Sequence, residues 1–200
     1  MDHFSFRKVL LSGRMWVFHL QDVLALFPDV SEKTIKNNLG NWVRKGYIGR
    51  LRKDVYEISD PPVGGLSDYY VANRLYEPSY VSLEAALSFY GVLPEEAAFV
   101  TSVTTKPTRT FRTLKGSFIY RTCKKEAYTG YRLMKIGGQK AFVADKEKAL
   151  VDHVYYRLMD GAKDFGGDRI DLSGLDGKKA AGYAKLFNKT TQETVAGLFK

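Results

Sequence analysis

The chain has 200 residues, a formal net charge of +9 and a pI of about 9.5, which together favour a polyanionic partner. Its 44% hydrophobic content is ordinary for globular domains and excludes a disordered polymer; without a long apolar run or a signal pattern, we expect neither membrane insertion nor secretion. The single cysteine, Cys123, excludes an internal disulfide and gives no zinc site, so we expect a reducing cytoplasmic compartment.

The first 60 residues predict a small domain of helices and one hairpin. Periodic apolar residues predict a helix over 4–11, a strand over 15–18 and a second helix over 20–27 that ends before Pro28. A third helix begins after Ser31, a good N-cap, and stops at Gly46. Residues 47–58 then predict a two-stranded hairpin that turns at Lys53-Asp54. This order of elements is that of a winged helix-turn-helix domain.

The third helix of this domain is amphipathic in a way that suits DNA recognition. Its apolar residues Ile35, Leu39 and Trp42 recur at helical spacing, and polar side chains of the kind that read base edges occupy the opposite face. The hairpin, or wing, carries cations that can contact phosphates. The residues expected to contact double-stranded DNA are Lys33, Thr34, Asn37, Asn41, Arg44, Arg50, Arg52 and Lys53. The alternative is an ordinary amphipathic helix and hairpin with a solvated charged face.

A linker rich in proline and glycine, residues 61–65, separates this domain from a second one at 66–200. We expect helices at 66–76, 82–90, 145–158, 175–188 and 190–199, with a capping box at Thr190 and Glu193. We expect strands at 99–104, 109–114, 117–123, 128–136 and 139–144, a loop at 161–177 and a possible short strand at 169–172. The predicted fold class is α+β: a winged helix-turn-helix, then a mixed α/β domain with a mostly antiparallel sheet and flanking helices.

The predicted strands of the second domain are strongly basic. Residues 101–143 carry a net charge of +9, and their cations alternate with aromatic residues, as on surfaces that bind single-stranded nucleic acid. The cations expected to form a surface for RNA or another polyanion are Arg109, Arg112, Arg121, Lys124, Arg132 and Lys135. The alternative is that the rings form the buried face of the sheet and the cations form its solvated face.

No catalytic, metal or cofactor site is predicted. Asp145, Glu147, Lys148 and Asp152 resemble the ligands of a metal-dependent nuclease, but such enzymes place them on neighbouring strands, whereas here they share one helix. We therefore expect them on a solvated helix face. We expect His153 to be a satisfied core histidine, and residues 164–168 to be a tight loop rather than a cation site.

Three stretches of the chain carry a resemblance that covers nearly its whole length. They are GYIGRLRKDVYEI at 46–58, YVANRLYEPSYVSLEAALSFYGVLPEE at 70–96 and ADKEKALVDHVYY at 144–156. Together with the basic strands, they resemble the AbiEi family of bacterial antitoxins. One departure is the wing turn, Lys53-Asp54, where a glycine is more usual.

The resemblance implies a two-part function and no enzymatic activity. The winged helix of that family represses the operon shared with a toxin by binding promoter repeats. Its second domain counteracts a nucleotidyltransferase-like toxin of an abortive-infection system in the type IV manner, without a stable complex. On this chain, the resemblance assigns the operator contacts to the DNA-facing residues given above. Two alternatives remain open: a regulator whose second domain senses a ligand or oligomerises, and a nuclease that depends on Asp145 or Glu147.

Overall fold

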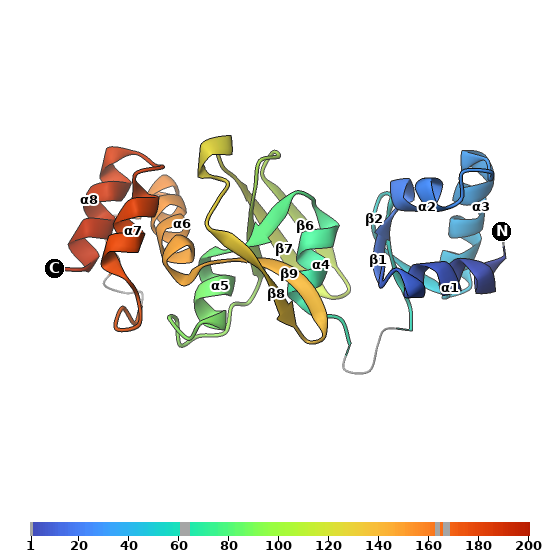
Figure 1. Ribbon diagram of the computed structural model, residues 1–200, viewed down its shortest axis with the longest axis horizontal. Coiled ribbons are helices and arrows are strands. Elements are labelled where there is room, and N and C mark those ends of the chain that lie inside the picture. Colours follow the sequence, from blue (N-terminus) through green and yellow to red (C-terminus); the bar gives the residue numbers. More distant parts are fainter. Residues whose placement is uncertain (1, 61–64, 163–164, 166–168) are drawn as a thin grey trace. The chain divides into compact units, whose positions relative to one another are not determined.

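The computed structural model describes residues 2–60, 65–162, 165 and 169–200, and the chain divides into two compact units, Met1–Ser67 and Asp68–Lys200 (Figure 1). The predicted linker therefore lies outside the described residues except for Gly65, as does the predicted loop at 164–168 except for Phe165. No helix within the described ranges combines the length and the apolarity needed to cross a bilayer.

The first unit has the predicted order of helix, strand, two helices and hairpin (Figure 1). Its three strands form one antiparallel sheet in the order β1-β3-β2. The helices cover a core that includes Phe6, Phe18, Ile35, Leu39 and Trp42. The elements are α1 (His3–Ser12), β1 (Val17–His19), α2 (Leu20–Leu26), α3 (Glu32–Arg44), β2 (Ile48–Arg52) and β3 (Val55–Ile58).

The boundaries of α3 and the wing follow from local chemistry. The Ser31 hydroxyl accepts a hydrogen bond from the Thr34 N–H at 3.2 Å, which caps the start of α3 as predicted. Gly46 follows the helix with a φ of +74°. At the wing turn Asp54 has a φ of +59°, a conformation that aspartate tolerates better than most residues, so the turn forms without glycine. The Asp54 carbonyl accepts the N–H of Leu20 at 2.9 Å, which ties the wing to the start of α2.

The second unit contains a mixed six-stranded sheet in the order β6-β7-β5-β4-β9-β8. Three neighbouring pairs are antiparallel and two, β5 with β7 and β4 with β9, are parallel. The elements of this unit are α4 (Asp68–Leu75), β4 (Ser79–Val81), α5 (Leu83–Phe89), β5 (Val100–Thr104), β6 (Arg109–Thr113), β7 (Gly116–Thr122), the 3-10 helix η1 (Lys125–Ala127), β8 (Tyr131–Ile136), β9 (Gln139–Ala144), α6 (Lys146–Met159), α7 (Gly177–Ala184) and α8 (Lys189–Leu198).

This architecture confirms the α+β class with flanking helices and corrects three details. Strand β4 was not predicted, although it lies between two sheet neighbours. Residues 169–172 form no strand. The cap of α8 is Asn188, whose side chain accepts the N–H of Thr191 at 2.9 Å, so the predicted capping box at Thr190 is wrong.

Helices cover both faces of the sheet. Tyr120 on β7 donates its hydroxyl hydrogen to the Ala72 carbonyl of α4 at 2.7 Å, whereas Tyr80 on β4 bonds Asp152 of α6 at 3.2 Å. The strand registers place these two tyrosines on opposite faces, because Tyr120 shares a face with Val81, the neighbour of Tyr80. Thus α4 covers one face and α6 the other, and α7 and α8 pack against α6 (Figure 1).

The polar residues of α6 are buried, so the predicted solvated helix face is wrong. Glu147, Lys148 and Asp152 are at most 3% exposed because α6 lies between the sheet and three other helices. Lys148 forms an ion pair with Asp152 and bonds the Tyr80 hydroxyl at 2.9 Å. His153, predicted to be a core histidine, is 2% exposed and lies 3.0 Å from a carboxylate oxygen of Glu84. The helix therefore carries a buried polar network.

Strands β4 and β9 diverge after a single register pair, Val81 with Val143. The buried side chain of Asn73 on α4 occupies the gap. Its Nδ2 donates to the carbonyls of Ser79 and Phe142 at 3.3 and 3.4 Å, and its Oδ1 accepts the Phe142 N–H at 2.5 Å. A side chain thus replaces the backbone ladder where the sheet splits.

Candidate nucleic-acid interface

The predicted DNA-contacting residues of α3 lie together on one exposed face. Ile35, Leu39 and Trp42 are buried and anchor the opposite face of the helix in the core. Residues three or four apart in a helix are neighbours on its surface, so the exposed side chains form a continuous polar strip. The exposed residues of this strip are Lys33, Thr34, Asn37, Asn41 and Arg44.

The members of the strip differ in how much of their hydrogen-bonding capacity the protein uses. Thr34 shares a hydrogen bond with Ser31 at 2.9 Å between the two hydroxyl oxygens, and Arg44 donates to the side-chain oxygen of Asn41. Lys33 and Asn37 form no side-chain hydrogen bond with any residue in the described part of the chain. Their donors and acceptors are therefore available to a binding partner.

The wing presents its cations near the same helix. Arg50 and Lys53 are exposed, whereas Arg52 is half-buried and donates to the Lys53 carbonyl at 3.1 Å. The pKa of Lys36 on α3 is raised, mainly by its 2.5 Å ion pair with Glu32 and to a smaller extent by the negative charge of Asp54 in the wing turn. Strand β2 of the wing also contacts α3, so the wing lies beside this helix.

The basic residues predicted on the strands of the second unit do not form one surface. Arg109 lies opposite Tyr120 and so faces α4, whereas Arg112 and Arg121 lie on the other face of the sheet. On β8, Arg132 and Lys135 also point to opposite faces, and β8 and β6 are the two outer edges of the sheet. Strand alternation therefore divides the set, and the exposed Lys124 lies beyond the end of β7.

Two of these cations are engaged by acidic residues. Arg121 forms an ion pair with Asp160 at 2.7 Å, and its guanidinium carbon lies 4.8 Å from the centre of the Tyr156 ring. Arg132 lies 3.7 Å from Asp145. Their charges are partly offset within the protein, so they offer less to a polyanion than the exposed Arg112 or Lys135.

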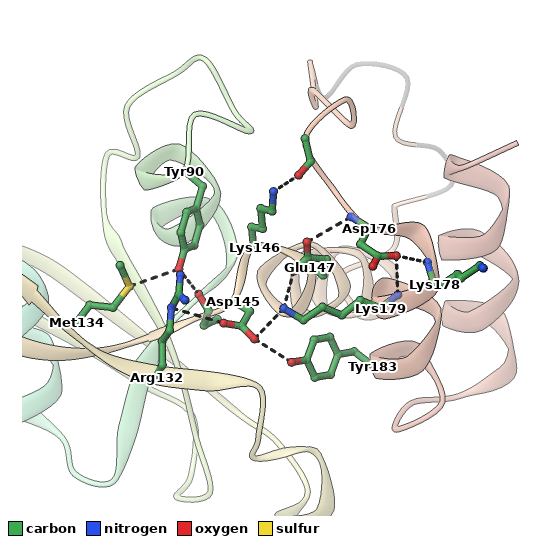
Figure 2. Close-up of polar contacts among 12 residues, drawn as sticks. Tyr90, Arg132, Met134, Asp145, Lys146, Glu147, Asp176, Lys178, Lys179 and Tyr183 are labelled. Carbon is green, nitrogen blue, oxygen red and sulfur yellow. Dashed lines mark hydrogen bonds and ion pairs between the residues drawn. The ribbon is translucent and has the colours of Figure 1, made fainter.

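The acidic pair at the start of α6 belongs to a cluster of ion pairs and hydrogen bonds (Figure 2). Asp145 accepts bonds from Lys179 and Tyr183, both at 3.0 Å, and the second oxygen of Glu147 lies 3.0 Å from the same lysine. Burial alone would lower the pKa of Lys179, but the hydrogen bonds and negative charges of the two carboxylates raise it by a larger amount. The net shift of the pKa is therefore upward. The cluster attaches α7 to α6.

This cluster differs from a nuclease centre in what its carboxylates contact. The Lys179 ammonium holds both Asp145 and Glu147, and Glu147 also accepts the N–H of Asp176 at 3.3 Å. Among the residues that the structure describes, no three His, Cys, Asp or Glu side chains gather as a metal site. Sequence reasoning missed Lys179 and Tyr183 because they come from a helix some thirty residues downstream; the only signal was the acidic pair itself.

Comparisons with protein-family models and with curated proteins gave no match to this chain. Its function is therefore inferred from its own residues and geometry. What these define is a two-unit α+β protein whose first unit exposes a polar helix face beside a basic hairpin.

Proposed function

We propose that the chain is a sequence-specific DNA-binding repressor, in which α3 reads the major groove and the β2–β3 wing contacts the phosphates. The observation that carries this proposal is the exposed strip of α3, which lies opposite a fully anchored apolar face. An α-helix fits the major groove, where asparagine can pair with adenine, lysine with guanine and the threonine methyl with thymine. Lys53 and Arg50 are suited to phosphate contacts, which set the register and the salt dependence.

We further propose, from the resemblance to AbiEi antitoxins, that the operator lies upstream of the gene itself and that the second unit acts as a type IV antitoxin. In this role it would counteract a nucleotidyltransferase-like toxin in the cytoplasm without a stable complex, and without catalysis of its own. The stretches at 70–96 and 144–156 support this half of the proposal. They form α4, β4, α5 and α6, the elements that build the centre of the second unit.

The DNA-binding proposal is tested by titrating the full chain against a duplex from its own promoter region and against a random duplex of the same length. We expect tighter binding to the promoter, with an affinity that falls steeply as salt increases. A chain with Lys33→Ala and Asn37→Ala should lose this preference, whereas Lys185→Ala, an exposed residue directly after α7, is the matched control. Equal affinity for both duplexes at every salt concentration would contradict sequence-specific binding.

The antitoxin proposal needs a separate readout. The neighbouring open reading frame is expressed as the toxin, and growth is compared with the full chain and with its Lys33→Ala, Asn37→Ala variant. We expect both to restore growth, because antitoxicity is assigned to the second unit. Failure of both proteins to restore growth, with promoter binding intact in the unchanged chain, would reduce the function to repression.

A further inference from the structure

A cavity of about 280 Å³ lies where β4 and β9 diverge in the second unit. Its walls come from α4, the start of β4, the segment before β8, and the β8–β9 hairpin. Four of the lining residues are aromatic: Tyr70, Tyr128, Tyr131 and Phe142. This volume is just below that of most small-molecule sites, roughly 300–1,000 Å³, so the cavity suits one planar ring rather than a large cofactor.

Two large apolar side chains at the mouth of the cavity are exposed to solvent. Leu133 and Phe142 are register partners on the β8–β9 hairpin, and they are 51% and 42% exposed. Phe142 and Tyr131 are nearly perpendicular, with ring centres 5.6 Å apart, and the Phe142 side chain remains partly exposed, so a ligand can reach its ring. Exposed apolar surface beside a cavity is typical of a ligand site.

One buried polar group at the wall favours a ligand that can form hydrogen bonds. Ser79 lines the cavity and is 3% exposed. Its hydroxyl has no hydrogen-bond partner among the residues that the structure describes. Asn73, which also lines the cavity, has its amide committed to the backbones of Ser79 and Phe142. The Asn73 amide is therefore already used by the backbone, whereas the Ser79 hydroxyl remains available to a ligand.

Two cations follow the aromatic residues along the same face of the hairpin. Lys135 and Lys140 are register partners, two residues beyond the Leu133–Phe142 pair, or roughly 7 Å along the strands. Both lysines are exposed, and Lys140 also lines the cavity. The charge of the nearby Arg74 is offset by Glu77 at 2.5 Å. A ring held at Phe142 would thus place an attached anionic group beside the two lysines.

We propose that this cavity binds a single nucleotide, with the base against Phe142 and Tyr131 and the phosphate at Lys135 and Lys140. Aromatic stacking with adjacent cations is the chemistry by which proteins hold unpaired nucleotides. The nucleotide can be a free mononucleotide or an unpaired residue of a single-stranded RNA, since both present the same base and phosphate. The inference does not depend on the DNA-binding proposal, because every residue that carries it belongs to the second unit.

Calorimetric titration of the full chain with the four ribonucleoside monophosphates and with a short single-stranded RNA tests the proposal. We expect saturable binding that weakens on the order of tenfold or more in Phe142→Ala, since a stacking contact is lost. Lys140→Gln should weaken binding several-fold and remove part of its salt dependence. Matched controls are Phe89→Ala, whose side chain is 41% exposed away from the cavity, and Lys185→Gln, directly after α7; neither should change the affinity.

The two ligand sources give different results within the proposal. If a monophosphate binds and competes with the RNA, a free nucleotide is a sufficient ligand. If only the RNA binds, and Phe142→Ala abolishes that binding, the ligand is an unpaired nucleotide within a strand. The proposal is overturned if neither ligand binds at millimolar concentration, or if the Phe142 and Phe89 variants bind alike. Unfolding curves for each variant and promoter affinity in the same preparations separate these outcomes from misfolding and from failure of the DNA-binding proposal.

Discussion

Asn73 and Phe142 are joined by hydrogen bonds in both directions: the side-chain oxygen accepts the Phe142 N–H at 2.5 Å, and the side-chain nitrogen donates to its carbonyl at 3.4 Å. Asn73→Leu keeps the approximate volume but removes the side-chain partner of three backbone groups, the Ser79 carbonyl and the carbonyl and N–H of Phe142. We expect it to lower the free energy of unfolding by about 2–4 kcal/mol, measured by urea denaturation. Asn73→Asp keeps the acceptor but turns a buried carboxylate oxygen toward two carbonyl oxygens, so at neutral pH it should cost at least as much. Equal stability of all three proteins would show that the gap in the sheet does not need a polar bridge.

The buried ion pair of Lys148 and Asp152 makes single and double substitutions behave differently. Asp152→Asn should destabilise the protein by about 3–5 kcal/mol, because it leaves the lysine charge buried without its partner. Lys148→Met combined with Asp152→Leu should cost less than the single change. As a control, Lys189→Met removes an exposed pair and should change stability by less than about 1 kcal/mol. A double variant less stable than Asp152→Asn would contradict this account.

The strip on α3 and the wing should contribute to DNA affinity in different ways. Asn37→Ala should cost about 1–3 kcal/mol on the promoter duplex and much less on a random duplex, because the change removes a base contact. Lys53→Gln should weaken both duplexes alike and lower the salt slope by about one. Lys53 is a cleaner test than Arg52, whose guanidinium also bonds the wing backbone. Identical losses for both variants on both duplexes would mean that α3 does not read base edges.

Burial and the charge of Asp152 raise the pKa of the Cys123 thiol from its ordinary value of 9.0 to about 11. At pH 8 the folded chain should therefore react with iodoacetamide about a hundredfold more slowly than the unfolded chain. The Cys123 thiol stays protonated to a higher pH in the folded chain than in the unfolded chain. The free energy of unfolding should therefore fall as pH rises from 9 toward 11. Cys123→Ala should reduce this dependence without abolishing it, because burial also raises the pKa of Tyr69, Tyr80 and Tyr156 above their ordinary value of 10.0. Since the chain has one cysteine, labelling reports on this site alone.

Features with strong local signals were predicted well from the sequence. Ser31 and Gly46 mark the ends of α3, and the turn at Lys53-Asp54 separates the wing strands, so the first unit could be laid out without tertiary information. The hairpins of the second unit were found for the same reason. Their turn residues, such as Gly137 and Gly138, lie between alternating strands.

Features that depend on distant partners could not be predicted in this way. Strand β4 has only three residues and no alternation of its own; it exists because β5 and β9 lie beside it. The polar residues of α6 suggest a solvated face, and only the docking of other helices shows that Lys148 and Asp152 satisfy each other inside the protein. The cavity likewise requires the divergence of two strands that are far apart in sequence.

The junction between β4 and β9 also determines how the second unit fluctuates. The backbones of β4 and β9 share one register pair, and the Asn73 side chain and the stacked rings of Tyr80 and Tyr131 add to it, whereas β5 and β7 share five register pairs. The β8–β9 hairpin can therefore separate from β4 while its own ladder and the rest of the sheet stay intact, since local opening costs only the bonds it breaks. Amide protons at this junction would then exchange with solvent faster than those of β5. A ligand bound in the cavity would slow that exchange.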